Sequence, residues 1–403
     1  MFEEIMACLN EAVAAREDEI ITFLRDIVAI PSMDGDIEAV GKRIGEEMVK
    51  LGYDAVYIDR YGSIVGRMGE GEKVILFDSH IDTVGIGSPE QWEWDPFEGK
   101  IEDGNLFARG ALDEKGSTPG MVYGIKLAKD LGLLDGFTAY YLGNIEEWCD
   151  GVGCQAFVEW EMITPDFVVI GEPTKMQVYR GHKGRIELEV IAHGRSAHAA
   201  SNHLGDNAIY KMVPVIESIE CMNDELPSDP FLGQGRITVT RVNSVSPSDN
   251  AVPDRCSIFI DRRITFGESK EGIIEGVRRA LPEDGVGFEL NELVYMEPSH
   301  TGAIFAYEKF FPAWALGEEH ELVQAGQQAI EALWGEKRTS GKWDFSTNGN
   351  YWNGKLGIPS IGFGPGDEIY AHAVNEHVPL ADVVEATKFY ALLPYMLRKS
   401  NGS

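Results

Sequence analysis

The first 180 residues alternate continuous apolar runs with amphipathic segments. The apolar runs predict β-strands at 55–58, 73–77, 138–142 and 167–170. Apolar residues at helical spacing predict helices at 1–20, 36–51, 116–133 and 153–161. Gly52 ends the second of these helices, and Pro119 is compatible with the third only in its first turn. Buried strands that alternate with helices are typical of an α/β fold with a mostly parallel sheet covered on both faces.

The pattern changes after residue 180 and returns near residue 296. Between these points, half-exposed strands are predicted at 185–192, 236–242, 257–264 and 285–293, and helices at 207–220 and 271–281. The order β-α-β-β-α-β is that of a ferredoxin-like α+β unit. A helix at 322–334, a strand at 360–363 and a helix at 381–396 then complete the first pattern. We therefore predict one domain built from residues 1–180 and 296–403, with a second domain inserted at 181–295.

Composition and charge narrow the classes of function. A chain of 403 residues is long enough for two domains, and its net charge of −31 argues against nucleic acid and anionic membrane surfaces as partners. No apolar stretch is long enough to span a membrane. The five cysteines are an odd number without a paired CxxC pattern, which favours a reducing, cytoplasmic location. Cys149 and Cys154 could be metal ligands, although small buried apolar residues are the favoured interpretation.

Side chains of the types that bind metals follow each of the predicted strands 73–77, 138–142, 167–170 and 360–363. In open parallel sheets, functional groups gather beyond the carboxyl ends of the strands. The residues found there, or in the loop before a predicted helix, are His80, Asp82, Asp113, Glu146, Glu147, Glu172 and His372. A set of histidines and carboxylates without thiolates suits zinc, cobalt or manganese in a catalytic site better than a closed structural zinc site.

Five segments carry a resemblance to a known superfamily. They are HIDT, RGALDEKG, NIEEW, GEPT and YAH, in this order along the chain. Together they resemble the acetylornithine deacetylase, succinyl-diaminopimelate desuccinylase and carboxypeptidase superfamily of dizinc metallohydrolases. The resemblance implies a zinc-peptidase-like catalytic domain, two Zn²⁺ ions per chain, with Co²⁺ or Mn²⁺ as alternatives, and an inserted lid and dimerisation domain. Within the superfamily, SPEQWEWDPF and EEWCDG look like the hydrolases linked to selenium metabolism.

The resemblance also implies a role for each residue of the predicted metal centre. Asp113 matches the carboxylate that bridges two metals, with His80 and Glu172 on one metal and Glu147 and His372 on the other. Asp82 matches the carboxylate that orients the His80 ring, and Glu146 matches the general base. Leu112 and Glu114 depart from the residues that flank the bridging aspartate in many relatives, which leaves the metal environment open at this point. The peptide bond after Asp113 is expected to be cis.

The inserted domain carries three further matches. GRSAHAA resembles the lid histidine segment and selects His198, DNAVPD selects Asn250, and DRR places Arg263 at the position that binds the substrate carboxylate. Without the resemblance, a salt bridge on the strand face is the favoured interpretation of Arg263. The superfamily implies a homodimer formed by the lid, in which His198 stabilises the oxyanion in the neighbouring subunit's site.

These observations predict a metal-dependent hydrolase. Its substrate is expected to be a small molecule that bears a carboxylate, and the bond that it cleaves is an N-acyl, N-carbamoyl or peptide amide. The resemblance implies a metal-bridging hydroxide with Glu146 as the base. Neither GxGxxG between a strand and a helix nor GxSxG is present, which argues against a dinucleotide enzyme and a serine hydrolase. Two alternatives stay open: a dipeptidase or carboxypeptidase with the same site, and a catalytically inactive metal-binding partner protein.

Overall fold

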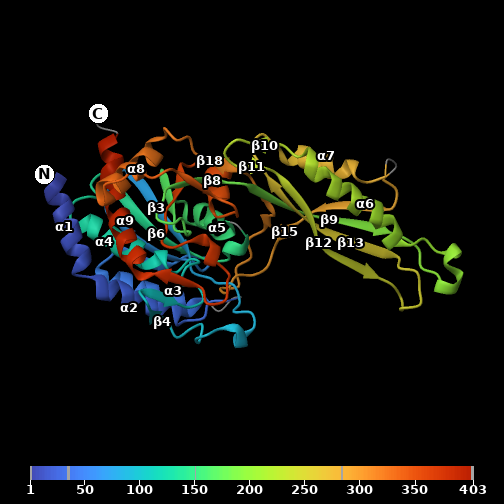
Figure 1. Cartoon of the computed structure of the whole chain (residues 1–403), viewed down its shortest axis with the longest axis horizontal. Coiled ribbons are helices and arrows are strands. Elements are labelled where there is room, and N and C mark those ends of the chain that lie inside the picture. The colour runs from blue at the N-terminus through green and yellow to red at the C-terminus, as the bar shows by residue number, and fades with distance from the viewer. Residues whose placement is uncertain (1, 34–36, 150, 283–284, 401–403) are drawn as a thin grey trace.

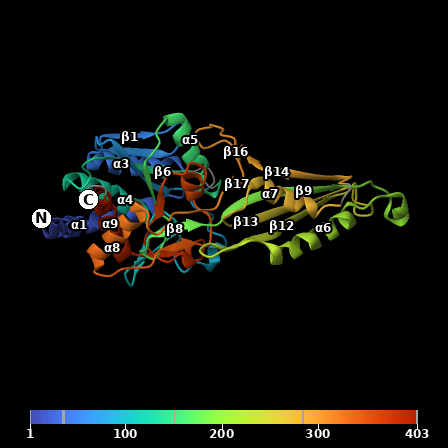
Figure 2. The ribbon, with the colours of Figure 1, turned by 90° about the horizontal axis from the view of Figure 1, so that it is seen from above.

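The protein consists of two parts with separate hydrophobic cores (Figure 1). The computed structural model describes residues 2–33, 37–149, 151–282 and 285–400. One part holds both termini and a large sheet flanked by helices, and the other part extends from it as a narrower sheet with two helices. Figure 2, from above, shows the same elongated arrangement. The predicted fold class, a catalytic α/β domain with an inserted lid, is confirmed.

The large sheet is parallel in its centre and antiparallel at both edges. Its strand order is β1-β2-β6-β3-β7-β20-β8-β18, with β19 beside β8. The four central strands, all mutually parallel, are β6 (Phe137–Asn144), β3 (Lys73–His80), β7 (Phe167–Ile170) and β20 (Ser360–Gly362). The edge strands are β1 (Ala55–Ile58), β2 (Ile64–Met68), β8 (Tyr179–His182), β18 (Trp314–Ala315) and β19 (Gly341–Trp343). The central strands are buried on both faces, which explains their continuous apolar runs.

Helices cover both faces of this sheet. They are α1 (Phe2–Ala14), α2 (Glu17–Val28), α3 (Glu38–Leu51), α4 (Ser117–Asp130), α5 (Val152–Glu161), α8 (Glu321–Trp334) and α9 (Leu380–Ser400). Helix α3 ends at Gly52, whose φ of 78° is the left-handed conformation that glycine adopts easily, while Asp36 lies outside the described residues. The prediction of a single helix over 1–20 is wrong, because Glu17, Asp18 and Glu19 form the first turn of a second helix, where acidic side chains are favourable.

The inserted domain is an antiparallel sheet in the order β12-β13-β9-β14. Its strands are β9 (Gly184–His193), β12 (Arg236–Val245), β13 (Arg255–Ile264) and β14 (Phe288–Glu292). Helices α6 (Ala208–Met222) and α7 (Lys270–Arg279) lie on one side of the sheet in Figure 1. Strand β8 still belongs to the large sheet, and the chain enters the lid at Gly184. The domain limits at 180 and 295 stay a prediction.

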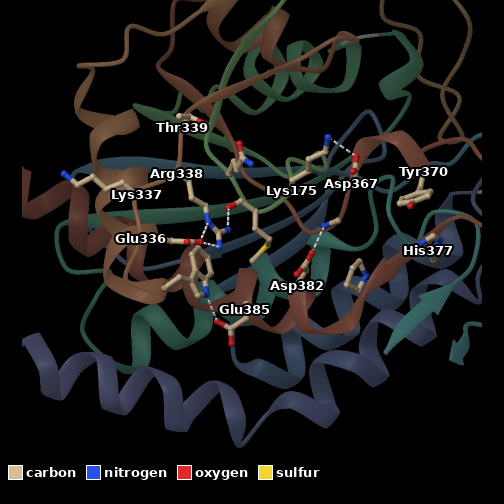
Figure 3. Close-up of a pocket in the computed structure, with 15 residues that line it drawn as sticks. Lys175, Glu336, Lys337, Arg338, Thr339, Asp367, Tyr370, His377, Asp382 and Glu385 are labelled. Atoms are coloured by element: carbon tan, nitrogen blue, oxygen red, sulfur yellow. Dashed lines mark hydrogen bonds and ion pairs between the residues drawn. The ribbon is translucent and has the colours of Figure 1, made fainter. Parts of the chain in front are cut away.

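Behind the loop that carries His372 lies a cavity of about 820 Å³ (Figure 3). Its wall is formed by α8, by the loop after Glu172 and by residues on both sides of His372, including Lys175, Tyr370 and His377. Lys175 and Asp367 form an ion pair across this loop, with Nζ and Oδ1 3.1 Å apart. None of the predicted metal ligands is among the described residues that line the cavity. No helix in the described ranges is long and apolar enough to cross a membrane.

Candidate metal centre

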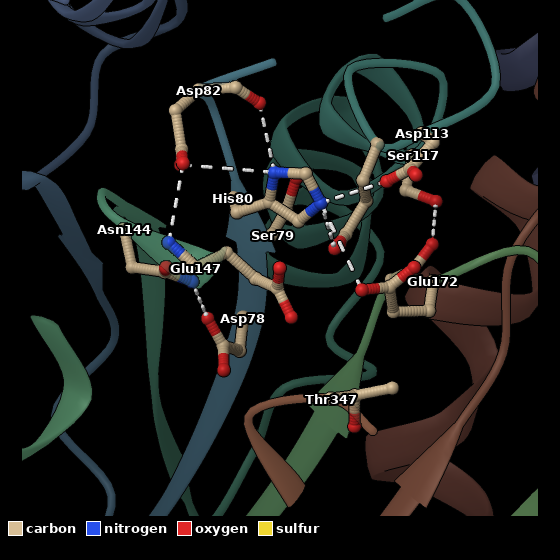
Figure 4. A network of polar contacts seen from close by, with 12 residues as sticks. Asp78, Ser79, His80, Asp82, Asp113, Ser117, Asn144, Glu147, Glu172 and Thr347 are labelled. Carbon is tan, nitrogen blue, oxygen red and sulfur yellow. Dashed lines mark hydrogen bonds and ion pairs between the residues drawn. The ribbon is translucent and has the colours of Figure 1, made fainter. Parts of the chain in front are cut away.

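The predicted ligands converge because the carboxyl ends of adjacent parallel strands meet at one edge of the sheet. His80 is the last residue of β3, and the Glu146–Glu147 pair follows β6. Glu172 follows β7, His372 lies in the loop after β20, and Asp113 precedes α4. Figure 4 shows His80, Asp113, Glu147 and Glu172 turned toward one another.

Asp113 lies between two histidines. Its Oδ1 is 2.9 Å from Nε2 of His80 (Figure 4). Its Oδ2 is 3.0 Å from Nε2 of His372. Burial opposes ionisation, but the hydrogen bonds and charges of the two imidazoles lower the pKa of Asp113 below its usual range. An ionised carboxylate that offers one oxygen to each side is the arrangement expected of a ligand shared by two cations.

The backbone of Asp82 orients the His80 ring. Nδ1 of His80 is 2.9 Å from the carbonyl oxygen of Asp82 and 3.7 Å from its Oδ1. Because a carbonyl can only accept, Nδ1 donates its proton to it, and Nε2 is the ring nitrogen that faces the centre. The Asp82 carboxylate instead accepts the backbone N–H of Glu147 at Oδ2, at 3.2 Å. Asp82 therefore holds both His80 and the segment that carries Glu147.

Two buried carboxylates complete the group around His80. Oε1 of Glu172 is 3.8 Å and Oε2 of Glu114 is 3.5 Å from Nε2 of His80. One ligand atom from each of these three residues lies within 4.8 Å of the other two. The second oxygens, Oε2 of Glu172 and Oε1 of Glu114, are buried without a hydrogen-bond partner in the described chain. Burial and the neighbouring carboxylates raise the pKa of both groups, and the charge of His80 offsets this only in part, so the cluster fits a divalent cation.

The sequence did not predict Glu114 as part of this group. Its position after the bridging aspartate was noted only as a departure from relatives. The peptide bond between Asp113 and Glu114 is cis, as predicted. Cys149 and Cys154 are both buried. The Cys154 thiol donates to Oδ2 of Asp78 at 3.5 Å, in line with its interpretation as a small buried side chain.

The two adjacent glutamates have different surroundings. The charge of Glu147 raises the pKa of Glu114 and Glu172, so its carboxylate acts on the same group. Oε2 of Glu146 accepts hydrogen bonds from the hydroxyls of Tyr61, at 3.0 Å, and Tyr295, at 2.5 Å. Burial raises the pKa of Glu146, while the two phenols lower it by a smaller amount. Glu147 therefore acts on the carboxylates around His80, whereas Glu146 is held by two tyrosine hydroxyls.

Glu376 supports the bridging aspartate from behind. Its Oε1 accepts the backbone N–H groups of Leu112, at 2.9 Å, and Asp113, at 3.0 Å. Its Oε2 accepts from the Arg109 guanidinium at 2.5 Å, and both side chains are buried. Sequence reasoning missed this pair, as it missed Tyr61 and Tyr295. The only signal was the position of Glu376 four residues after His372, on the loop that returns to the site.

The three residues predicted to act from the lid, His198, Asn250 and Arg263, lie in the inserted domain. His198 caps the short helix η3 (Ala199–Leu204), which Figure 1 shows at the end of the lid remote from the large sheet. The side chain of His198 is exposed, and the backbone carbonyl of Asn250 accepts from Ala199 at 2.8 Å, so His198 and Asn250 are brought together. Arg263 forms a two-point ion pair with Asp261, at 2.7 and 3.1 Å, which is the alternative considered for it. Their predicted roles in catalysis stay predictions.

Comparison with known proteins places the chain in a family. A model of "Peptidase family M20/M25/M40" matches residues 76–395. The chain belongs to the M20/M25/M40 peptidase family. The predicted superfamily and the enzyme class, a metallohydrolase, are therefore confirmed. The narrower resemblance to hydrolases linked to selenium metabolism stays a prediction.

Relatives and solved structures extend over most of the chain. The uncharacterized protein YgeY of Escherichia coli K12 is 42% identical over 93% of this chain and 94% of its own. A succinyl-diaminopimelate desuccinylase of Thioalkalivibrio sulfidiphilus is 25% identical over 86% and 90%. The M20 family metallo-carboxypeptidase Sso-CP2 of Sulfolobus solfataricus shares the fold, with a TM-score of 0.76, 18% identity and coverage of 94% and 99%. The Bacillus subtilis YXEP protein, a dinuclear metal binding peptidase, has a TM-score of 0.71 with 14% identity and coverage of 96% and 99%.

Proposed function

We propose that this M20 family protein hydrolyses the amide bond of a small substrate that bears a carboxylate: an N-acyl or N-carbamoyl amino acid, or a short peptide. The observation that carries the proposal is Asp113 between His80 and His372, beside two buried carboxylate oxygens without a partner among the described residues. Such a concentration of histidine and carboxylate groups is costly unless cations bind there.

Two divalent cations fit this set of donors. Asp113 would be shared, His80 and Glu172 would hold one ion, and Glu147 and His372 the other. Nitrogen and oxygen donors suit Zn²⁺, and Co²⁺ or Mn²⁺ are accommodated by the same groups. When bound, a metal pair lowers the pKa of a water molecule from 15.7 to about 7 and polarises the scissile carbonyl.

Glu146 is the proposed general base. The hydroxyls of Tyr61 and Tyr295 hold Oε2, while Oε1 has no hydrogen-bond partner in the described part of the chain. Oε1 can therefore accept a proton from the attacking water and deliver it to the leaving amine. Burial of Glu146 raises its pKa toward the range that suits proton transfer near neutral pH.

The lid supplies the remaining groups in this proposal. His198 and Asn250 lie at the remote end of the lid of their own chain, which supports action on the site of a second subunit. A homodimer through the lid would place His198 as a donor to the oxyanion. Arg263 would turn from Asp261 to the substrate carboxylate, to which a guanidinium can donate two parallel hydrogen bonds. We place the protein in the cytoplasm.

A dipeptidase or carboxypeptidase with the same site is the second candidate, supported by the M20 carboxypeptidase that shares the fold. The inactive-protein alternative is disfavoured because Glu146 and all five proposed ligands are present. A screen of N-acyl and N-carbamoyl amino acids against dipeptides, with added Zn²⁺, distinguishes the three. Faster turnover of dipeptides would replace the first proposal by the second, and no turnover of any class would favour the inactive protein.

The different roles proposed for Glu146 and Glu147 can be tested by comparing the alanine variants of the two residues. Glu146→Ala should keep its metal and lose most of its turnover, because only the base is removed. Glu147→Ala should lose metal affinity. Equal loss of metal from both variants would show that the roles are wrongly assigned.

A further inference from the structure

Glu114 is a buried side chain of the metal centre to which the proposed function gives no role. It follows the bridging Asp113 and is 1% exposed. Its Oε2 is 3.5 Å from Nε2 of His80, which is its one polar side-chain contact within the described residues. Its Oε1 is buried and has no hydrogen-bond partner there. The carboxyl group of Glu114 is therefore not satisfied by the protein alone.

His80 is the positive charge in contact with Glu114, but its two nitrogens serve other groups. Its Nε2 is 2.9 Å from Oδ1 of Asp113, and its Nδ1 donates to the carbonyl of Asp82 at 2.9 Å. Even a protonated His80 therefore leaves Glu114 without a donor. A neutral Glu114 is no better satisfied, because its O–H needs an acceptor and no hydrogen bond joins it to the described chain. Burial of such a group is costly, and a bound cation removes the cost.

The position of Glu114 fits a ligand of the same cation as His80 and Glu172. Two ligands of one cation, each at about 2.1 Å from it, are at most about 4.2 Å apart. Nε2 of His80 is 3.5 Å from Oε2 of Glu114 and 3.8 Å from Oε1 of Glu172. The carboxylate has room because residue 171 is glycine, where a Cβ atom would come within 2.5 Å of Oε1 of Glu114.

With Glu114 included, the two metal positions differ in their donors. The position beside His372 has three protein groups, the number typical of a catalytic Zn²⁺ that also binds water. The other position has four protein groups, which are His80, Asp113, Glu114 and Glu172. Zn²⁺ favours four ligands in all, whereas Mn²⁺ favours six and suits carboxylate oxygens. Zn²⁺ binds most such sites more tightly than Mn²⁺, so a fourth protein group should narrow this difference.

We propose that Glu114 is a sixth protein ligand of the metal pair, on the cation beside His80, and that it makes this position accept Mn²⁺ more readily than the position beside His372 does. The inference rests on the proposed function and deepens it, because it assigns different metal preferences to the two halves of the same site. Zn²⁺ still fits both positions, and Glu114 changes the ratio of the two affinities.

The first test measures metal binding to the chelated wild type, Glu114→Gln and Glu319→Gln. The paramagnetic resonance signal of free Mn²⁺ gives its affinity, and competition with a chromogenic chelator gives that of Zn²⁺. Glutamine has the shape of a neutral glutamate but cannot supply an ionised carboxylate. Glu114→Gln should lower Mn²⁺ affinity at one position by more than the 10- to 100-fold typical of residues that only orient a ligand, and Zn²⁺ affinity clearly less. Glu319→Gln removes the same charge from an exposed site and should bind both metals like the wild type.

Unchanged Mn²⁺ affinity in folded Glu114→Gln, or a fall of equal size for Mn²⁺ and Zn²⁺, would overturn the inference. If the wild type hydrolyses no amide but its Mn²⁺ binding depends on Glu114, the proposed function fails and the role of Glu114 stands. If amides are hydrolysed while Mn²⁺ binding ignores Glu114, the function stands and the inference fails.

The second test uses bound Co²⁺, whose visible absorption is strong in four-coordinate sites and weak in six-coordinate sites. In the wild type, one of two Co²⁺ ions should absorb weakly, and Glu114→Gln should strengthen its absorption. Strong, four-coordinate absorption from both ions of the wild type would overturn the added ligand, whether or not the variant folds.

Discussion

The hydroxyl of Tyr295 donates a hydrogen bond to Oε2 of Glu146 at 2.5 Å, across 149 positions of the sequence. Tyr295 ends β15 (Val294–Tyr295), in the segment by which the chain returns from the lid. Further along the same segment, Nε2 of His300 is 3.1 Å from the carbonyl oxygen of Gly62, in the loop that also carries Tyr61. The position of the proposed base is therefore set by the junction between lid and catalytic domain.

Tyr295→Phe should lower kcat by about tenfold with little change in KM, because loss of one charge-assisted hydrogen bond releases the base and not the substrate. Steady-state kinetics of the metal-loaded protein measure this. Tyr210→Phe is the control, since Tyr210 is 74% exposed on the lid. A normal kcat in Tyr295→Phe, or an equal loss in the control, would contradict a positioning role.

The support of Asp113 by Glu376 leads to a second prediction. Glu376→Gln weakens the ion pair with Arg109 and disturbs the two N–H contacts that fix the backbone at Leu112 and Asp113. Residues that orient a ligand typically contribute 10- to 100-fold in metal affinity or activity. We expect metal affinity to fall by about that range, measured by competition with a chromogenic chelator. Unchanged affinity in a folded variant would show that Asp113 needs no such support.

Stability should depend on pH through His182. This ring is buried and accepts from Thr347, and burial lowers its pKa to about 4. The unfolded chain then binds the proton more readily, so the contribution of His182 is complete above its unfolded pKa of about 6.5 and is lost as pH falls toward the folded value.

Between pH 7 and pH 5, the wild type should lose about 2 kcal/mol more of its free energy of unfolding than His182→Asn. Urea unfolding of the chelated proteins at both pH values gives the difference. Parallel losses in the two proteins would mean that His182 is not held in its neutral form.

The proposed exchange of His198 between subunits predicts complementation. Glu146→Ala and His198→Ala should each be nearly inactive alone. In a mixed dimer, the chain that keeps Glu146 receives an intact His198 from its partner. Random pairing of equal amounts makes about half of the dimers mixed, each with one complete site, so about a quarter of normal activity is expected. No recovery, although mixed dimers are shown to form, would mean that His198 acts within its own chain or not at all.

Much of the fold could be predicted because its central strands are buried on both faces. The apolar runs at 73–77 and 167–170 and the helical spacing between them indicated a parallel sheet, and the strand ends indicated the ligands. Some of the antiparallel strands at the edges of the large sheet were not predicted. A strand such as β18 has only two residues, which is too short to show a periodic pattern. Helix α1 was merged with α2 because apolar spacing continues across the break.

The contacts that tune the site could not be predicted from local pattern. Tyr61 is 85 positions from Glu146, and Glu376 is 263 positions from Asp113, so only the folded chain brings them together. Glu114 was not predicted as a member of the group, because its position beside Asp113 was interpreted only as a departure from relatives. Arg263 was predicted through the resemblance alone, and its ion pair with Asp261 is the contact that strand alternation favours.

The central claim is that Asp113 is shared by two metal ions on which hydrolysis depends. Metal analysis of the purified protein, together with turnover before and after exhaustive chelation, tests it most directly. We predict close to two divalent ions per chain, loss of hydrolysis on chelation, and recovery when Zn²⁺ is returned. Full activity of the chelated, metal-free protein would contradict the account.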